Sequence, residues 1–164
     1  MGYSLAFYKD KTGSGILTLS KFQRIVTIFA FLVVTGAFIF NALNHHSLWI
    51  NGFFLILTFL ACFYRESWYF STKDQSITFS FGLAFWVKKN IIPIENINGI
   101  KMVKILQKSG KDKGEKIITT QLILTAGEKD AIIDSVKGRK TKNLELYATE
   151  IAKILGLELE KISI

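Results

Sequence analysis

Cysteine, proline and histidine are scarce in this sequence. Cys62 is the only cysteine, so no disulfide can form within the chain, and in its apolar run it is expected to act as a small buried hydrophobe. Residues 65–164 contain neither His nor Cys, which excludes His/Cys zinc sites, Cys-His nucleophiles and Ser-His-Asp triads there. Glycine-rich phosphate-binding motifs are also missing. We therefore expect a protein that is not an enzyme and that holds no metal or cofactor.

Acidic and basic side chains are missing from residues 25–64. Two apolar runs, 25–43 and 48–64, fill this segment on either side of a four-residue link. The first run matches the ~30 Å hydrocarbon core of a membrane, and the second is near the short end of the spanning range, about 17 residues. Because the link is short, the second helix must return antiparallel to the first. The sequence therefore predicts a two-helix transmembrane hairpin.

Two alternatives to a membrane hairpin fit the apolar runs less well. A helical hairpin buried in a globular core normally keeps a polar face, and neither run has one. A secretory signal peptide is disfavoured because the first run begins after 24 residues and exceeds a typical h-region. No small-x-small cleavage site precedes His45.

Basic residues flank both outer ends of the hairpin and are absent from its turn. Lys21 and Arg24 precede the first run, and Arg65 and Lys73 follow the second. The positive-inside rule then places both termini in the cytoplasm, as expected for a multi-pass protein of the cell inner membrane.

Aromatic residues are expected to mark the two membrane interfaces. Trp49 and Tyr64 suit opposite interfaces, and Trp68 and Tyr69 would extend the inner belt. The two adjacent histidines of the turn lack further ligand residues, so we expect a solvated turn there and no metal site.

Net charge is +8, and the mean hydropathy is +0.30. Residues 65–164 carry 17 Lys or Arg against 12 Asp or Glu. A basic chain with a membrane span favours an anionic lipid surface. Nucleic-acid binding is not expected, because the aromatic residues alternate as core positions and do not interleave with the basic clusters.

From Glu66 the apolar residues recur with period two, which is typical of half-buried strands. Strands are expected over 68–73, 77–81, 83–92, 99–106, 117–125 and 131–136, with Gly82 at a turn. For residues 1–24, a short β-hairpin, a strand that joins the main domain and a mobile tail lying on the membrane surface all remain open. Residues 157–164 are expected to form a last extended piece.

An amphipathic helix is expected over 142–155, capped at its start by Thr141 or Asn143 and ended by Gly156. It should cover the open end of the sheet. Its apolar stripe consists of Leu144, Tyr147, Ala148, Ile151, Ala152 and Leu155. The chain thus divides into an N-terminal cytoplasmic segment (1–24), a transmembrane hairpin (25–64) and a cytoplasmic β domain (65–164).

Three segments, Trp68 to Asp74, Ile77 to Leu83 and Ile92 to Ile97, together resemble the bacterial pleckstrin-homology-like (PH-like) domains found beside transmembrane hairpins. That family has a strand, a turn with Asp, a strand ending near Gly-Leu and an Ile-Pro-Ile segment in this order. The resemblance covers residues 66–155. More loosely, the chain is similar to the photosystem I assembly factors of plastids and cyanobacteria, which also have two spans, a β-rich domain and a C-terminal helix.

The resemblance implies an α+β membrane protein, in which the two-helix hairpin is followed by a PH-like antiparallel β-barrel or sandwich with a C-terminal helix as its cap. It implies a non-enzymatic role and assigns no binding residue.

Two basic clusters are candidate sites for an anionic ligand. The first comprises Lys108, Lys111, Lys113 and Lys116, and the second comprises Lys137, Arg139, Lys140 and Lys142. The second cluster lies at the start of a predicted helix, where lysines oppose the helix dipole and a bound anion would relieve the repulsion. Lipid phosphate or an acidic partner is the hypothesis for these clusters, and solvated loops that keep the domain near an anionic leaflet are the alternative.

Two functions follow from these features. We expect first a membrane-anchored binding or scaffold module that holds a partner protein at the cytoplasmic face, with sheet edges open to β-augmentation. The second is an anionic lipid headgroup-binding domain that uses the basic loops. Self-association stays open, because Gly36 and Gly52 permit close helix approach although neither belongs to a small-x3-small pair.

Overall fold

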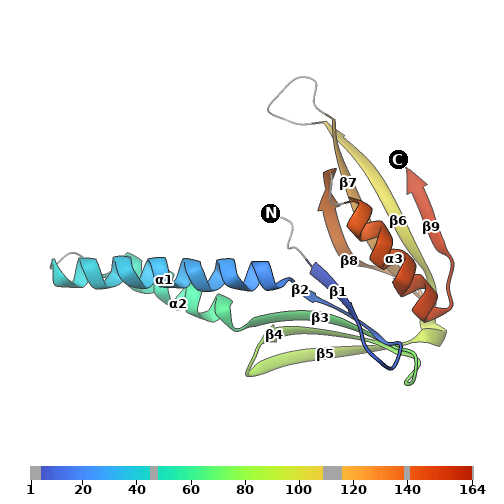
Figure 1. Ribbon diagram of the computed structural model, residues 1–164, viewed down its shortest axis with the longest axis horizontal. Coiled ribbons are helices and arrows are strands. Elements are labelled where there is room, and N and C mark those ends of the chain that lie inside the picture. The colour runs from blue at the N-terminus through green and yellow to red at the C-terminus, as the bar shows by residue number, and fades with distance from the viewer. Residues whose placement is uncertain (1–4, 45–47, 109–115, 139–140, 164) are drawn as a thin grey trace.

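The computed structural model describes residues 5–44, 48–108, 116–138 and 141–163. Over these ranges the chain forms three α-helices and two β-sheets, which confirms the expected α+β class. A pair of long helices extends away from the sheets, and the third helix lies against them (Figure 1). The histidine turn of the helix pair lies outside the described residues.

The first sheet has five strands, and each is antiparallel to its neighbour in the order β1-β2-β3-β4-β5. Of the alternatives for the N-terminal segment, the β-hairpin is observed. It joins the sheet through β2, in which Thr18 faces Ser67 of β3. The strands are β1 (Leu5–Lys9), β2 (Gly15–Leu19), β3 (Tyr64–Ser71), β4 (Ser76–Leu83) and β5 (Trp86–Pro93).

The second sheet has the strand order β8-β7-β6-β9, and the single turn of 3-10 helix η1 (Ile94–Asn96) leads into it. Only the β6–β9 pair of this sheet is parallel. Every strand predicted after Glu66 is present, with slightly different ends. The strands are β6 (Ile97–Lys108), β7 (Lys116–Ala126), β8 (Lys129–Lys137) and β9 (Leu159–Ser163).

One predicted turn is misplaced. Gly82 does adopt a positive φ of 139°, but β4 continues through it to Leu83, and the turn follows at Ala84 and Phe85. The reason is that Gly82 pairs with Val87 in the β4–β5 ladder, where the missing side chain leaves room for the Trp86 carbonyl.

Helix α3 (Thr141–Leu155) contacts β3 of the first sheet and all four strands of the second. Its predicted stripe is buried at Leu144, Ala148, Ile151, Ala152 and Leu155, and Tyr147 is partly buried. The predicted end of the helix is confirmed: Gly156 has φ 67°, and the Leu157 N–H donates to the Ala152 carbonyl at 2.9 Å. The core formed with the sheets includes Leu17, Phe70, Ile77, Met102, Leu122 and Leu124.

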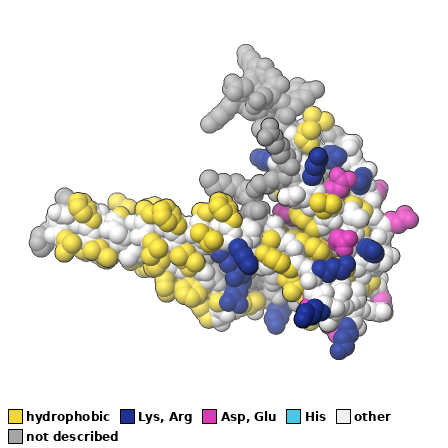
Figure 2. All heavy atoms as spheres, in the orientation of Figure 1, with side chains coloured by type: hydrophobic (Ala, Val, Ile, Leu, Met, Phe, Trp, Pro, Cys, Tyr) yellow, Lys and Arg dark blue, Asp and Glu magenta, His cyan; other side chains and the backbone are white. Residues whose placement is uncertain are grey.

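The apolar helices α1 (Lys21–Leu43) and α2 (Trp49–Cys62) pack against each other, with the rings of Phe31 and Phe59 5.8 Å apart. Neither helix contains a buried residue. This exposure argues against the globular-core alternative. Figure 2 shows yellow hydrophobic side chains along the outside of the pair.

The two helices differ in how well they match a membrane. α1 has 23 residues, so at about 1.5 Å per residue it is roughly 35 Å long and has the length and composition of a membrane span. An N-terminal signal sequence shares these features. α2 has 14 residues, roughly 21 Å, and falls short of a span by itself. The predicted second span, 48–64, is therefore too long, because the chain leaves the helix at Phe63 and enters β3 at Tyr64.

Candidate functional site

The helix pair is rooted directly in the first sheet. β2 ends at Leu19, and the Ser20 hydroxyl caps α1 by accepting the Gln23 N–H at 3.2 Å. At the other end, α2 is followed after one residue by β3. Since β2 and β3 are paired neighbours, the two helices occupy the place of a turn between adjacent strands. Their base is held by the sheet on both sides.

A pocket of about 190 Å³ lies at this base. We call it the junction pocket. It is lined by residues of α1, α2, β3 and the β4–β5 turn, and its polar side chains include Gln23, Arg24, Thr27 and Arg65. Both arginines are exposed, and Figure 2 shows Lys and Arg side chains gathered where the helix pair meets the sheets. Two guanidinium groups around one small pocket favour an anion.

Only some of the basic residues used to predict the orientation lie at this base. Lys21 opens α1, and Arg65 is the second residue of β3. Lys73 lies in the turn after β3, beyond an eight-residue strand that spans roughly 26 Å at about 3.3 Å per residue. Lys73 is therefore remote from the base, although it follows the second apolar run in sequence. Lys88 and Lys89 lie closer to the base, because β4 brings the chain back to it and both lysines are early in β5.

The predicted aromatic belt is corrected at one position. Trp68 is only 4% exposed and stacks on Phe79 with ring centroids 4.3 Å apart, so it is a core residue and not an interfacial one. Trp49 is 89% exposed at the start of α2, the end of the helix pair remote from the sheets. Two aromatic residues that the sequence did not single out, Phe85 and Trp86, are exposed at the β4–β5 turn.

The predicted basic clusters lie elsewhere in the fold. Lys137 ends β8, Lys142 is the second residue of α3, and both are exposed. The strand register puts the end of β6 that carries Lys108 at the same end of the second sheet as Lys137. Figure 1 shows this end well away from the base of the helix pair. Four further members of the clusters, Lys111, Lys113, Arg139 and Lys140, lie outside the described residues, as does the side chain of Lys108.

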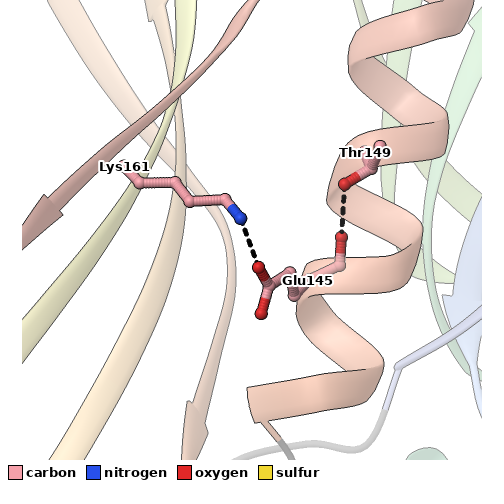
Figure 3. Close-up of polar contacts among 3 residues, drawn as sticks. All are labelled: Glu145, Thr149 and Lys161. Carbon is pink, nitrogen blue, oxygen red and sulfur yellow. Dashed lines mark hydrogen bonds and ion pairs between the residues drawn. The ribbon is translucent and has the colours of Figure 1, made fainter.

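Two acidic side chains of α3 form ion pairs with lysines of other elements. Glu145 of α3 pairs with Lys161 of β9, and the Thr149 hydroxyl donates to the Glu145 carbonyl at 2.9 Å (Figure 3). Glu150 pairs with Lys9 of β1 at 2.9 Å. The lysine partner lowers the pKa of each glutamate. No group of three or more His, Cys, Asp or Glu in the described ranges is arranged to hold a metal ion.

One polar contact inside the fold has a measurable consequence. The hydroxyl of Tyr147 on α3 donates to the carboxylate of Asp134 on β8, which is 7% exposed. Burial, followed by the charge of Asp134 and the hydrogen bond to it, raises the pKa of Tyr147 well above its ordinary value. The folded chain therefore keeps this proton at a pH where the unfolded chain releases it.

Replacing Tyr147 by phenylalanine is expected to lower the free energy of unfolding by about 1–3 kcal/mol, because a buried carboxylate loses a donor. In the unchanged chain, the contribution of Tyr147 is complete below about pH 10 and declines above it by about 1.4 kcal/mol per pH unit. Urea unfolding in detergent at pH 8 and pH 11 would measure both effects. An equal pH dependence of the free energy of unfolding in the unchanged chain and in the Tyr147→Phe variant would contradict this role of Tyr147.

Comparison of the chain with protein-family models, with curated proteins and with solved structures finds no match. The class of protein is therefore defined by the fold and the junction alone. It is an α+β chain in which an exposed apolar helix pair connects two neighbouring strands of a β-rich domain, and one of the two helices has spanning length.

Proposed function

We propose that this chain is a membrane-anchored binding or scaffold module. In this proposal α1 and α2 form a membrane hairpin, and the β-rich domain holds a partner protein at the cytoplasmic face. The observation that carries it is the exposed apolar helix pair rooted between β2 and β3. An exposed apolar surface of this extent needs lipid or protein to cover it.

The pairing of β2 with β3 supports a hairpin that crosses and returns. β2 precedes α1 and β3 follows α2, yet Thr18 and Ser67 are ladder partners, so both ends of the helix pair lie on one side of any membrane. If α1 crosses, α2 must bring the chain back. Its short length is then accommodated by local thinning of the bilayer or by polar flanking residues that reach the interface.

The same pairing weighs against α1 as a cleaved signal sequence. Cleavage after α1 would remove β1 and β2, and with them Leu17, which is fully buried in the core of the domain. Lys21, Arg24 and Arg65 at the base favour the cytoplasmic side for both termini. A C-terminal tag should then be protected from protease added to intact cells, and digestion of the tag would contradict this orientation.

A PH-like relationship is part of the proposal. The strands β3 to β8, followed by α3, are consistent with the antiparallel strands and C-terminal helix that this resemblance implies for residues 66–155. β1, β2 and β9 lie outside the part of the chain that the resemblance covers.

Partner binding is proposed at a sheet edge. β8 is an edge strand of the second sheet, and its Ile132 is 55% exposed. An extended peptide could add to such an edge through main-chain hydrogen bonds. The test is purification of the tagged full chain from detergent-solubilised membranes. A stoichiometric partner should be present, should be lost with Ile132→Lys and should be retained with Leu146→Lys, which changes a residue of α3 that is 69% exposed.

Anionic lipid binding through the basic loops is the second candidate. It is favoured by the exposure of Lys137 and Lys142 at the two ends of the β8–α3 connection. In neutral detergent, added phosphatidylglycerol should raise the melting temperature of the full chain by mass action. The rise should be smaller when Lys137, Arg139, Lys140 and Lys142 are all replaced by alanine. An unchanged rise would remove these residues from the site.

A further inference from the structure

The turn between β4 and β5 lies against the base of the helix pair. The Ala84 N–H at its tip donates to the Phe63 carbonyl at 2.9 Å, directly after the end of α2. The rings of Phe63 and Phe85 are 6.4 Å apart. Figure 1 shows β4 and β5 running together to this turn on the side from which the helices extend. The turn is therefore continuous with the apolar surface of α2.

The tip of this turn carries large apolar side chains that are mostly exposed. Phe85 is 70% exposed and Trp86 is 81% exposed. Turn tips normally carry Gly, Asn, Asp or Ser, which suit water and tight backbone geometry. Here the geometry is met by Gly82, since a Cβ atom there would lie 2.2 Å from the Trp86 carbonyl oxygen. The exposed tip is thus left with aromatic residues.

Basic residues follow the aromatic tip in the sheet. Lys88 and Lys89 are exposed on β5, and Arg65 shares a ladder row with Gly82 and Val87. One acid, Glu66, lies in the next row, where Phe81 separates it from Lys88. The aromatic rings are thus at the tip and the cations lie behind them. This order matches a membrane interface, where aromatic rings lie in the glycerol region and cations meet the lipid phosphates.

We infer that the β4–β5 turn is a second membrane contact of this chain. Phe85 and Trp86 enter the interfacial region of an anionic phospholipid leaflet, and Lys88, Lys89 and Arg65 meet its headgroup phosphates. The inference rests on the proposed membrane hairpin and extends it. Two attachments, the helix pair and the turn, fix the tilt of the first sheet relative to the membrane, which a helix pair alone would leave free to vary.

The fluorescence of Trp86 in the full chain tests this contact. The chain and its Trp86→Phe variant are reconstituted into vesicles of phosphatidylcholine and phosphatidylglycerol, with or without bromine on the acyl chains near the headgroup. The difference between the two emission spectra reports Trp86. Brominated lipid is expected to quench it at least about twofold, since an interfacial indole lies within contact range of the acyl chains. Vesicles of phosphatidylcholine alone should quench it less.

A matched control is available on α3. Leu146 is 69% exposed, so Leu146→Trp in the Trp86→Phe background places an indole of similar exposure away from the turn. The emission of this added indole, taken as the difference from the Trp86→Phe variant, should be unaffected by bromine. The inference would be overturned if the control were quenched as strongly as Trp86. It would also be overturned if Trp86 were quenched equally with and without phosphatidylglycerol, because the cations would then play no role.

The test separates this inference from the proposed function. If the chain resists alkaline carbonate washing but Trp86 is unquenched and emits as in water, the membrane hairpin stands and the contact at the turn is overturned. If carbonate releases the chain, the hairpin and the contact are both overturned.

Discussion

Replacing Leu32 by arginine is expected to release the chain from the membrane. Leu32 is 60% exposed near the middle of α1, where lipid would surround it. A charged side chain at the centre of a spanning helix costs about 2.5–3.5 kcal/mol on insertion scales, or roughly a hundredfold in the inserted-to-released ratio. The fraction of full-length chain that stays in the pellet after an alkaline carbonate wash would measure it.

The control for this experiment is Leu146→Arg. Leu146 is exposed to a similar extent, 69%, but it belongs to α3 of the β-rich domain. An arginine there remains in water, so the pelleted fraction should equal that of the unchanged chain. Equal loss in both variants, or no loss in either, would mean that α1 does not lie in lipid.

Truncating Phe70 to alanine is expected to produce the largest loss of folding stability. Phe70 is fully buried on β3, and its side chain belongs to the core shared by both sheets and α3. Removing a buried aromatic ring of this size typically costs about 3–5 kcal/mol. Because domains have a total stability of about 5–15 kcal/mol, much of the margin would disappear. Urea unfolding of the full chain in detergent, followed by near-ultraviolet circular dichroism, would measure the loss.

Phe85→Ala provides the comparison, since it removes the same ring from a side chain that is 70% exposed. In detergent this variant should unfold within about 0.5 kcal/mol of the unchanged chain, as is usual for exposed positions. A Phe85 variant as unstable as the Phe70 variant would mean that the turn is part of the core and is not a free contact surface.

Much of the fold could be predicted because it is encoded in local periodicity. The strands after Glu66 follow a period of two, and the stripe of α3 follows helical spacing, so both were predicted within a few residues. The absence of charge over 25–64 likewise predicted two apolar helices. The length of α2 could not be predicted, because its apolar run continues into β3 without a polar break and the helix ends where sheet pairing begins.

The junction could not be predicted, because it depends on which strands are neighbours. Arg24 is in the first turn of α1 and Arg65 follows α2, and they line one pocket because β2 pairs with β3. Trp68 was assigned to the membrane interface because its position next to the hairpin carries no information about which face of β3 it occupies. The basic residues of 137–142 stand out because they are adjacent in sequence. Lys88 and Lys89 do not stand out, because only the pairing of β5 with β4 places them near the base of the helix pair.

The insertion of the helices between β2 and β3 also imposes an order on synthesis. β2 leaves the ribosome before α1, but its partner β3 is made only after the whole apolar segment. If the helix pair forms the proposed membrane hairpin, the half-finished sheet waits with Leu17 uncovered until the helices have entered lipid, and it closes only when both helix ends lie on the same side. A chain inserted the wrong way would then keep an unpaired strand edge.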